Sequence, residues 1–169
     1  MGERYGLFFE EFPADYPEKS RALLTGFALS GIQGYLFGRI NGEWTPARVR
    51  RASRYVSLAT EAVGDYLVRA MGGYRPHPLM MSSGKGWLLT APGTPLEKLE
   101  RELVRLKRGL FLASDGRLEL EAGTVPVVLV RPGGRRLMGG PWPDGMAQVH
   151  RAMERDKFQS RALFGLDRA

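Results

Sequence analysis

The stretch ALLTGFALSGIQGYLF, residues 22–37, is the most informative part of the sequence about the fold. Residues 22–29 are almost wholly apolar and predict a buried strand. Ser30 and Gly31 end that strand, and residues 32–37 are typical of the start of a short helix. Serine is a good helix N-cap, and the exposed N–H groups of such a turn can also hold a phosphate or an adenine edge. The two roles are compatible at Ser30.

The clearest element downstream is a helix over residues 46–71. Its apolar residues recur at gaps of three and four, which makes one continuous buried face. Thr45 can cap this helix and Pro46 suits its first turn. Gly72 and Gly73 are expected to end it.

A β-hairpin is expected after this helix. Strands are predicted over residues 79–82 and 87–91, on either side of the turn Ser83-Gly84-Lys85-Gly86. The turn lacks the G-x-x-x-x-G-K-[ST] pattern of a Walker loop. A plain hairpin turn is therefore the simpler interpretation, and a close approach of the turn to nucleotide phosphates is the alternative.

A second helix is expected over residues 95–111, where leucines repeat at gaps of three and four. About two heptads are too few for a coiled coil, so this stripe should pack on the sheet. Residues 117–121 and 125–130 form the last strand, or two parts of one strand bent around Gly123. A third helix is predicted over residues 145–158.

The predicted elements run strand, helix, strand, strand, helix, strand. This order is typical of an α+β, ferredoxin-like βαββαβ fold with both helices on one face of the sheet. A length of 169 residues suits one domain. We expect an N-terminal arm over residues 1–21, the βαββαβ domain over 22–132, and a loop with a C-terminal helical extension over 133–169.

Composition limits the classes of function. Lys and Arg number 25 against 18 Asp and Glu, a formal charge of +7. This surplus favours phosphate-bearing partners, although an arginine-rich solvated surface explains it equally well. The absence of cysteine excludes disulfides and thiolate metal sites and fits a reducing cytoplasm. We see no signal peptide and no run of about 18 apolar residues, so we expect a cytoplasmic protein without membrane contact.

Four stretches, taken in order, carry a family resemblance. They are FALSGIQGYLF (27–37), VRRASRYVSL (49–58), SSGKGWLL (82–89) and ERDKF (154–158). They resemble the D-I-S-G-I-Q turn, the L-R-A-R-S-F-Y-L helix, the S-G-G-G-K-F-Y-L-L hairpin and a charged exit segment. Those motifs belong to the first palm domain of the large subunit of type III CRISPR effector complexes. That palm is related to GGDEF and nucleotide-cyclase domains.

The resemblance implies a palm domain that supports ATP binding and assembly in antiviral defence. The implied nucleotide-binding residues are Ser30, Gly31, Ser82, Ser83 and Gly84. The implied partners are the other effector subunits, guide RNA and a second palm, which carries a G-G-D-D hairpin and makes cyclic oligoadenylates from ATP. We expect no cofactor on the chain alone, and ATP with Mg²⁺ in a complete assembly.

The chain departs from an active palm in its carboxylates. Two-metal nucleotidyl transfer needs acids on the first strand and on the hairpin. Ala28 stands where the family has Asp, and the hairpin offers Ser82, Ser83 and Lys85. Three acids lie on or before the last strand, where an active palm does not need them: Asp115, Glu119 and Glu121. We therefore expect no catalytic residue, no metal site and no activity of the chain alone.

Two arginine clusters are candidate contacts for RNA or for a partner subunit. The first consists of Arg48, Arg50, Arg51 and Arg54, and the second of Arg135 and Arg136. A solvated face is the alternative interpretation of both. Two other functions stay open: a stand-alone, homodimeric cyclase-like enzyme, and a small RNA-binding module.

Overall fold

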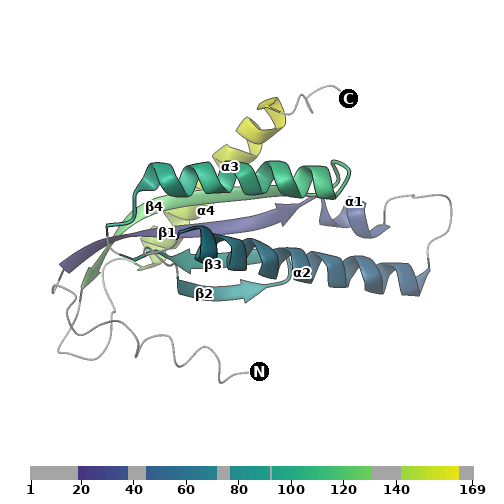
Figure 1. Cartoon of the computed structure of the whole chain (residues 1–169), viewed down its shortest axis with the longest axis horizontal. Helices are drawn as coiled ribbons and strands as arrows, with labels where there is room; N and C mark the ends of the chain where they lie inside the picture. Colours follow the sequence, from purple (N-terminus) through teal and green to yellow (C-terminus); the bar gives the residue numbers. More distant parts are fainter. Residues whose placement is uncertain (1–18, 38–44, 72–76, 92, 131–141, 164–169) are drawn as a thin grey trace, which may run out of the picture.

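The computed structural model describes five segments: residues 19–37, 45–71, 77–91, 93–130 and 142–163. Their helices and strands follow in this order (Figure 1): β1 Lys19–Ser30, α1 Ile32–Phe37, α2 Pro46–Ala70, β2 His77–Ser82, β3 Lys85–Leu89, α3 Leu96–Ala113, β4 Glu119–Val130 and α4 Trp142–Leu163. Arg135 and Arg136, and most of the predicted arm, lie outside the described residues.

The four strands form one antiparallel sheet in the order β2-β3-β1-β4. β1 pairs along its whole length with β4, from Lys19 opposite Val130 to Ser30 opposite Glu119. On its other side β1 pairs with β3, which in turn pairs with β2. This is the strand order of the split β-α-β, ferredoxin-like fold. The predicted fold class is therefore confirmed.

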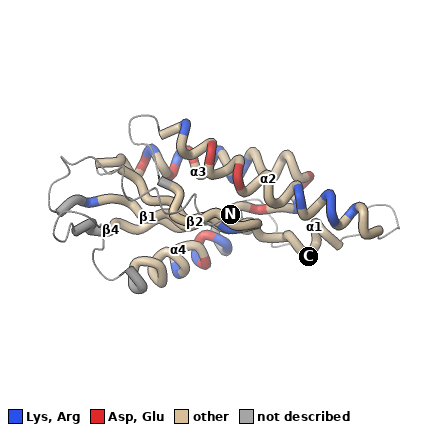
Figure 2. The backbone as a smooth tube through the Cα atoms, turned by 90° about the horizontal axis from the view of Figure 1, so that it is seen from below, with Lys and Arg blue, Asp and Glu red and all other residues tan. Residues whose placement is uncertain are grey.

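Helices α2 and α3 lie side by side on one face of the sheet, as predicted (Figure 2). The core beneath them contains Phe27 of β1, Leu67 of α2 and Leu99 of α3, all fully buried. Side chains alternate between the two faces of a strand, and Phe27 is on the face that α2 and α3 cover. Its ring fills the space above Gly86, where an added Cβ would lie 2.3 Å from the ring.

Helix α4 covers the opposite face of the sheet (Figure 2), and the sequence did not predict this packing. Val149 and Met153 of α4 form a second core with Leu24 and Trp87. The helix comes very close to β4, since a Cβ on Gly123 would lie 2.5 Å from the carbonyl oxygen of Val149. Glycine is therefore required where α4 crosses the strand.

Polar contacts fix the C-terminal half of α4. Asp156 accepts the backbone N–H of Ala122 at 2.9 Å and also pairs with Lys107 of α3. Lys157 pairs with Glu121 at 3.4 Å. Ala122 lies on the edge strand β4, where alternate N–H groups point away from the sheet. Asp156 therefore satisfies a donor that the sheet leaves unpaired.

The element boundaries differ by a few residues from those predicted. β1 begins at Lys19, inside the range given to the arm. The last strand is one continuous strand rather than two parts, and the hairpin turn is shorter than predicted because Lys85 already begins β3. Thr45 caps α2 as predicted, accepting the N–H of Arg48 at 3.3 Å. Within the described segments, no helix is long and apolar enough to cross a membrane.

Candidate functional site

The end of β1 and the tip of the β2–β3 hairpin lie against each other. The N–H of Leu29 donates to the carbonyl of Gly84 at 2.8 Å, and the N–H of Gly84 donates to the hydroxyl of Thr60 at 2.8 Å. Thr60 is buried on α2 and its hydroxyl donates to the carbonyl of Val56 at 2.8 Å. The hairpin tip is therefore fixed by a strand on one side and by a helix on the other.

Two of the predicted site residues, Gly31 and Gly84, are required by the backbone. Both have left-handed backbone angles, with φ of 79° and 85°. A Cβ on Gly31 would lie 2.2 Å from the carbonyl oxygen of Arg117, and one on Gly84 would lie 2.7 Å from Cδ1 of Ile32. Local geometry thus explains why both residues are glycine, without reference to a ligand.

The three predicted site serines are accessible around this tip. Ser82 and Ser83 are exposed, and Ser30 is partly exposed. Ser83 accepts a hydrogen bond from the hydroxyl of Ser57 on α2 at 3.0 Å. Ser30 is the last residue of β1, so Gly31, and not Ser30, directly precedes α1. The structure therefore brings the end of β1 and the hairpin serines to one end of the sheet.

Strand register places two acids beside these positions, which the sequence interpretation did not expect. Ala28 lies opposite Lys85 on β3 and opposite Glu121 on β4, and Ser30 lies opposite Glu119. Directly opposed residues of antiparallel strands point to the same face. Glu119 and Glu121 therefore share a face with Ala28 and Ser30, the face that α4 partly covers.

The charges on this face come from β4 and from the hairpin. Glu121 is largely buried and pairs with Lys157 at 3.4 Å, whereas Lys85 is exposed at the hairpin. Among the described residues, no group of three or more His, Cys, Asp or Glu side chains is placed to hold a metal ion. The hairpin itself offers hydroxyls and an ammonium group, which suit a phosphate oxygen or the edge of a base.

A cleft of about 480 Å³ opens between α2 and β2, next to the hairpin. Ser57 and Ser83 line the end of the cleft that the hairpin closes. Glu61 and Asp65 line it further along α2. These two carboxylates repel phosphate groups. An anionic ligand at the hairpin is therefore better accommodated on the side of Lys85 than inside this cleft.

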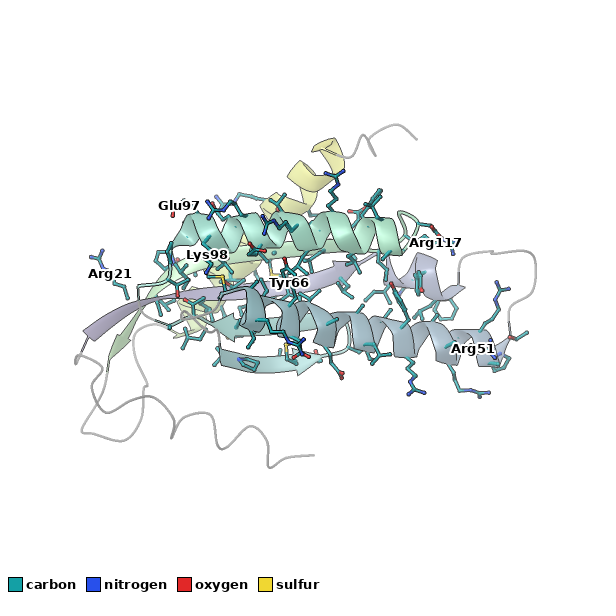
Figure 3. All side chains as sticks on the ribbon, in the orientation of Figure 1. Arg21, Arg51, Tyr66, Glu97, Lys98 and Arg117 are labelled. Atoms are coloured by element: carbon teal, nitrogen blue, oxygen red, sulfur yellow. The ribbon has the colours of Figure 1, made fainter. Side chains whose placement is uncertain are left out.

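The arginines of α2 are divided between two sides of the helix. All four are exposed. Arg50 and Arg54 are seven and three residues before Ser57, so they lie on the side that contacts the hairpin. Arg48 and Arg51 fall on another side, and Arg51 lies near the start of α2 (Figure 3). Only the first pair belongs with the hairpin serines.

Helix α1 is held against α2 beside the same end of the sheet. The rings of Tyr35 and Tyr55 are 5.3 Å apart between centroids, with an angle of 32° between their planes. Partial burial, with the neighbouring Tyr55, raises the pKa of Tyr35 above its ordinary value of 10.0. This contact fixes the turn around Gly31 from the side of α2.

Solved structures of Csm1 share this fold. Csm1 of T. onnurineus matches with a TM-score of 0.62 and 22% identity, over 83% of this chain and 20% of that one. A Csm1–Csm4 cassette in complex with AMPPNP matches with a TM-score of 0.65 and 18% identity, over 92% and 21%. The Csm1–Csm4 subcomplex of the type III-A CRISPR-Csm interference complex gives 0.59 and 18%, over 82% and 19%. No protein-family model and no curated protein matches.

These comparisons confirm, at the level of the fold, the resemblance found in the sequence motifs. The match includes most of this chain, whereas the chain spans only about 20% of the length of those structures. This chain therefore has the fold of one domain within a subunit of type III CRISPR effector complexes.

Proposed function

We propose that this chain is a non-catalytic palm domain of a type III CRISPR effector subunit that supports ATP binding and assembly in antiviral defence. The observation that best supports this proposal is the geometry of the hairpin tip. Gly84 is fixed against the end of β1 and against α2, while Ala28 and the hairpin carry no carboxylate. A rigid nucleotide-facing tip without metal ligands fits a supporting role better than independent turnover.

The chemistry of the tip favours a nucleotide. The hydroxyls of Ser30, Ser82 and Ser83 can donate to phosphate oxygens or accept from an exocyclic amine. Lys85 adds positive charge for the phosphates on the α4 face of the sheet, and Arg50 of α2 adds it on the opposite face. Because the tip is already held by hydrogen bonds, little conformational entropy is lost when a ligand binds.

We expect the chain to act as part of a larger assembly. Structures with this fold contain Csm4 beside Csm1, and cassettes are known in complex with AMPPNP and with one ATP. We place this chain in the cytoplasm beside other effector subunits, guide RNA and a second palm. The second palm would supply the carboxylates that hold Mg²⁺, which this chain lacks at the hairpin.

ATP binding to the assembly isolated with a tagged chain tests the nucleotide claim. With Mg²⁺ present, Ser30→Phe should weaken ATP binding about tenfold, or 1.4 kcal/mol, because the ring occupies space beside the hairpin. Ala147→Phe, at an exposed position of α4, is the matched control and should bind like the wild type. Equal affinity of all three proteins would remove the nucleotide claim.

A second candidate function, catalysis by a homodimer, is favoured by one observation. Glu119 and Glu121 lie on the same sheet face as Ser30 and Ala28, so this face does carry two carboxylates. The test is incubation of the purified chain with ATP and Mg²⁺ or Mn²⁺. A cyclic or oligomeric adenylate that Glu119→Gln abolishes would establish this function, and the absence of product would exclude it.

A further inference from the structure

A groove of about 370 Å³ runs between α2 and α3, on the side away from the sheet. Its lining is mostly apolar and rich in small residues, among them Ala59 and Ala62 of α2 and Gly109 and Ala113 of α3. Nothing lies within 4 Å of the position of a Cβ on Gly109. The small residues therefore leave an open channel along the contact between the two helices.

Large apolar side chains stand exposed beside this groove. Leu58 of α2 is 54% exposed and Leu112 of α3 is 64% exposed. Leu58 is one helical turn before Ala62, and Leu112 is one helical turn after Gly109, so both border the groove. Tyr66, which lines it, is 37% exposed and lies between the helices (Figure 3). Exposed apolar patches of this kind mark interaction surfaces.

The charge beside the groove is positive. Arg101, Arg105 and Arg108 succeed one another at gaps of four and three, so they form one row along α3. Arg105 lines the groove directly. The nearby carboxylate of Glu102 is already neutralised, because it accepts from Tyr66 at 2.7 Å and from Arg105 at 2.9 Å. Since Glu102 and Arg105 neutralise each other, the positive charge that the row adds beside the apolar channel comes from Arg101 and Arg108, both exposed.

We propose that this groove binds an amphipathic helix of a partner protein whose polar side is acidic along one edge. Its apolar side chains would enter the channel above Ala62 and Gly109, and its carboxylates would face the arginine row. An amphipathic helix binds a hydrophobic groove of this kind by inserting apolar side chains at every third or fourth residue. This inference does not depend on the nucleotide claim.

A second copy of the chain is a poorer occupant. Each copy carries a formal charge of +7, so two copies repel each other, whereas an acidic helix is attracted. RNA would satisfy the arginine row but would leave Leu58 and Leu112 without apolar contact. The combination of exposed leucines with arginines is met only by a partner that is apolar and acidic at once.

A displayed library of helical peptides tests the proposal on the full chain. Each peptide would have about 18 residues, a length of about 27 Å, with leucines fixed at gaps of three and four and the other positions drawn from Glu, Lys, Gln and Ala. Selection on the wild-type chain should enrich Glu over Lys along one edge. The selected peptide should then lose about tenfold in affinity for the variant Arg101→Glu/Arg108→Glu. That variant leaves the Arg105–Glu102 pair in place.

The matched control is Arg151→Glu/Arg155→Glu, which reverses two exposed charges of α4 on the other side of the sheet. The proposal predicts wild-type affinity for this control and a loss of binding for Leu112→Asp. Enrichment of Lys, or equal binding to the two charge-reversed variants, would overturn it. So would sedimentation showing a dimer that Leu58→Asp dissociates, or single-stranded RNA that binds through Arg101 and Arg108 where no peptide binds.

Discussion

The hydroxyl of Ser57 on α2 donates to the hydroxyl of Ser83 at the tip of the β2–β3 hairpin, at 3.0 Å. One helical turn further along α2, Thr60 accepts the N–H of Gly84, the next residue of the tip. The same helix carries Arg50 and Arg54 on the side of Ser57. One helix therefore fixes the hairpin and also carries two arginines on the side that contacts it.

The first prediction concerns the buried anchor of the tip. Thr60→Val keeps the shape of the side chain but leaves the buried N–H of Gly84 without an acceptor. An unsatisfied buried donor costs about 1–3 kcal/mol, so the free energy of unfolding in urea should fall by that amount. Ser57→Ala, which removes only exposed hydrogen bonds, to Ser53 and Ser83, should cost less than about 1 kcal/mol. Equal losses for the two variants would contradict the role given to Thr60.

The second prediction concerns the close approach of α4 to the sheet. Gly123→Ala places a methyl group 2.5 Å from the carbonyl oxygen of Val149, and overpacking of this kind costs about 1–3 kcal/mol. Gly109→Ala is the matched control, because its Cβ meets open space on an α-helix. The control should gain about 0.5–1 kcal/mol. Denaturation curves that show no loss for Gly123→Ala would mean that α4 does not pack as described.

The third prediction concerns pH. The pKa of Glu102 is lowered from its ordinary value of 4.5, first by the hydrogen bond from Tyr66 and then by the charges of Arg105 and Arg101, which together outweigh its burial. A lowered folded-state pKa stabilises the protein above the unfolded value, and this stabilisation is lost as the pH falls through the folded value. The stability difference between the wild type and Glu102→Gln should therefore be full above about pH 4.5 and shrink below it.

Urea unfolding at a series of pH values measures this difference. Glu100→Gln is the matched control, since Glu100 is exposed on the same helix. At neutral pH this control should lose less stability than Glu102→Gln, which also removes the hydrogen bonds from Tyr66 and Arg105. A difference between Glu102→Gln and the wild type that stays constant from pH 7 to pH 3 would contradict the pairing of Glu102 with Tyr66.

The fourth prediction separates the two sides of the α2 arginine cluster. If nucleic acid approaches the hairpin, Arg50→Glu/Arg54→Glu should weaken binding of single-stranded RNA and make it less dependent on salt. Two lost phosphate contacts lower the slope of log K against log salt by about 1.4. Arg48→Glu/Arg51→Glu, on the other side of the same helix, should keep the wild-type slope. Equal slopes for both variants would show that RNA does not contact the side of α2 that faces the hairpin.

The sheet and the tip could be predicted from the sequence because their signals are local. An apolar run before Ser30, glycines in a short turn and leucines at helical gaps each specify one element. The division of the arginines between two sides of α2 follows from their spacing, but only the hydrogen bond between Ser57 and Ser83 shows which side contacts the hairpin. The site serines came together because the βαββαβ order brings the end of β1 beside the hairpin.

Two features could not be predicted because they depend on tertiary packing. The position of α4 on the sheet depends on Gly123, where the helix comes close to β4. In the sequence, Gly123 indicated only a bend in the last strand. The position of Glu119 beside Ser30 depends on the register between β1 and β4, which lie far apart in the chain. The contact between α2 and α3 likewise decides which small residues form a groove.

The central claim, a palm domain within a type III CRISPR effector, is tested most directly by affinity purification of the tagged chain from its native host. Bound proteins would be identified by mass spectrometry and bound RNA by sequencing. The account predicts other effector subunits, a second palm and guide RNA in the same complex. Recovery of the chain alone, without effector subunits or guide RNA, would contradict it.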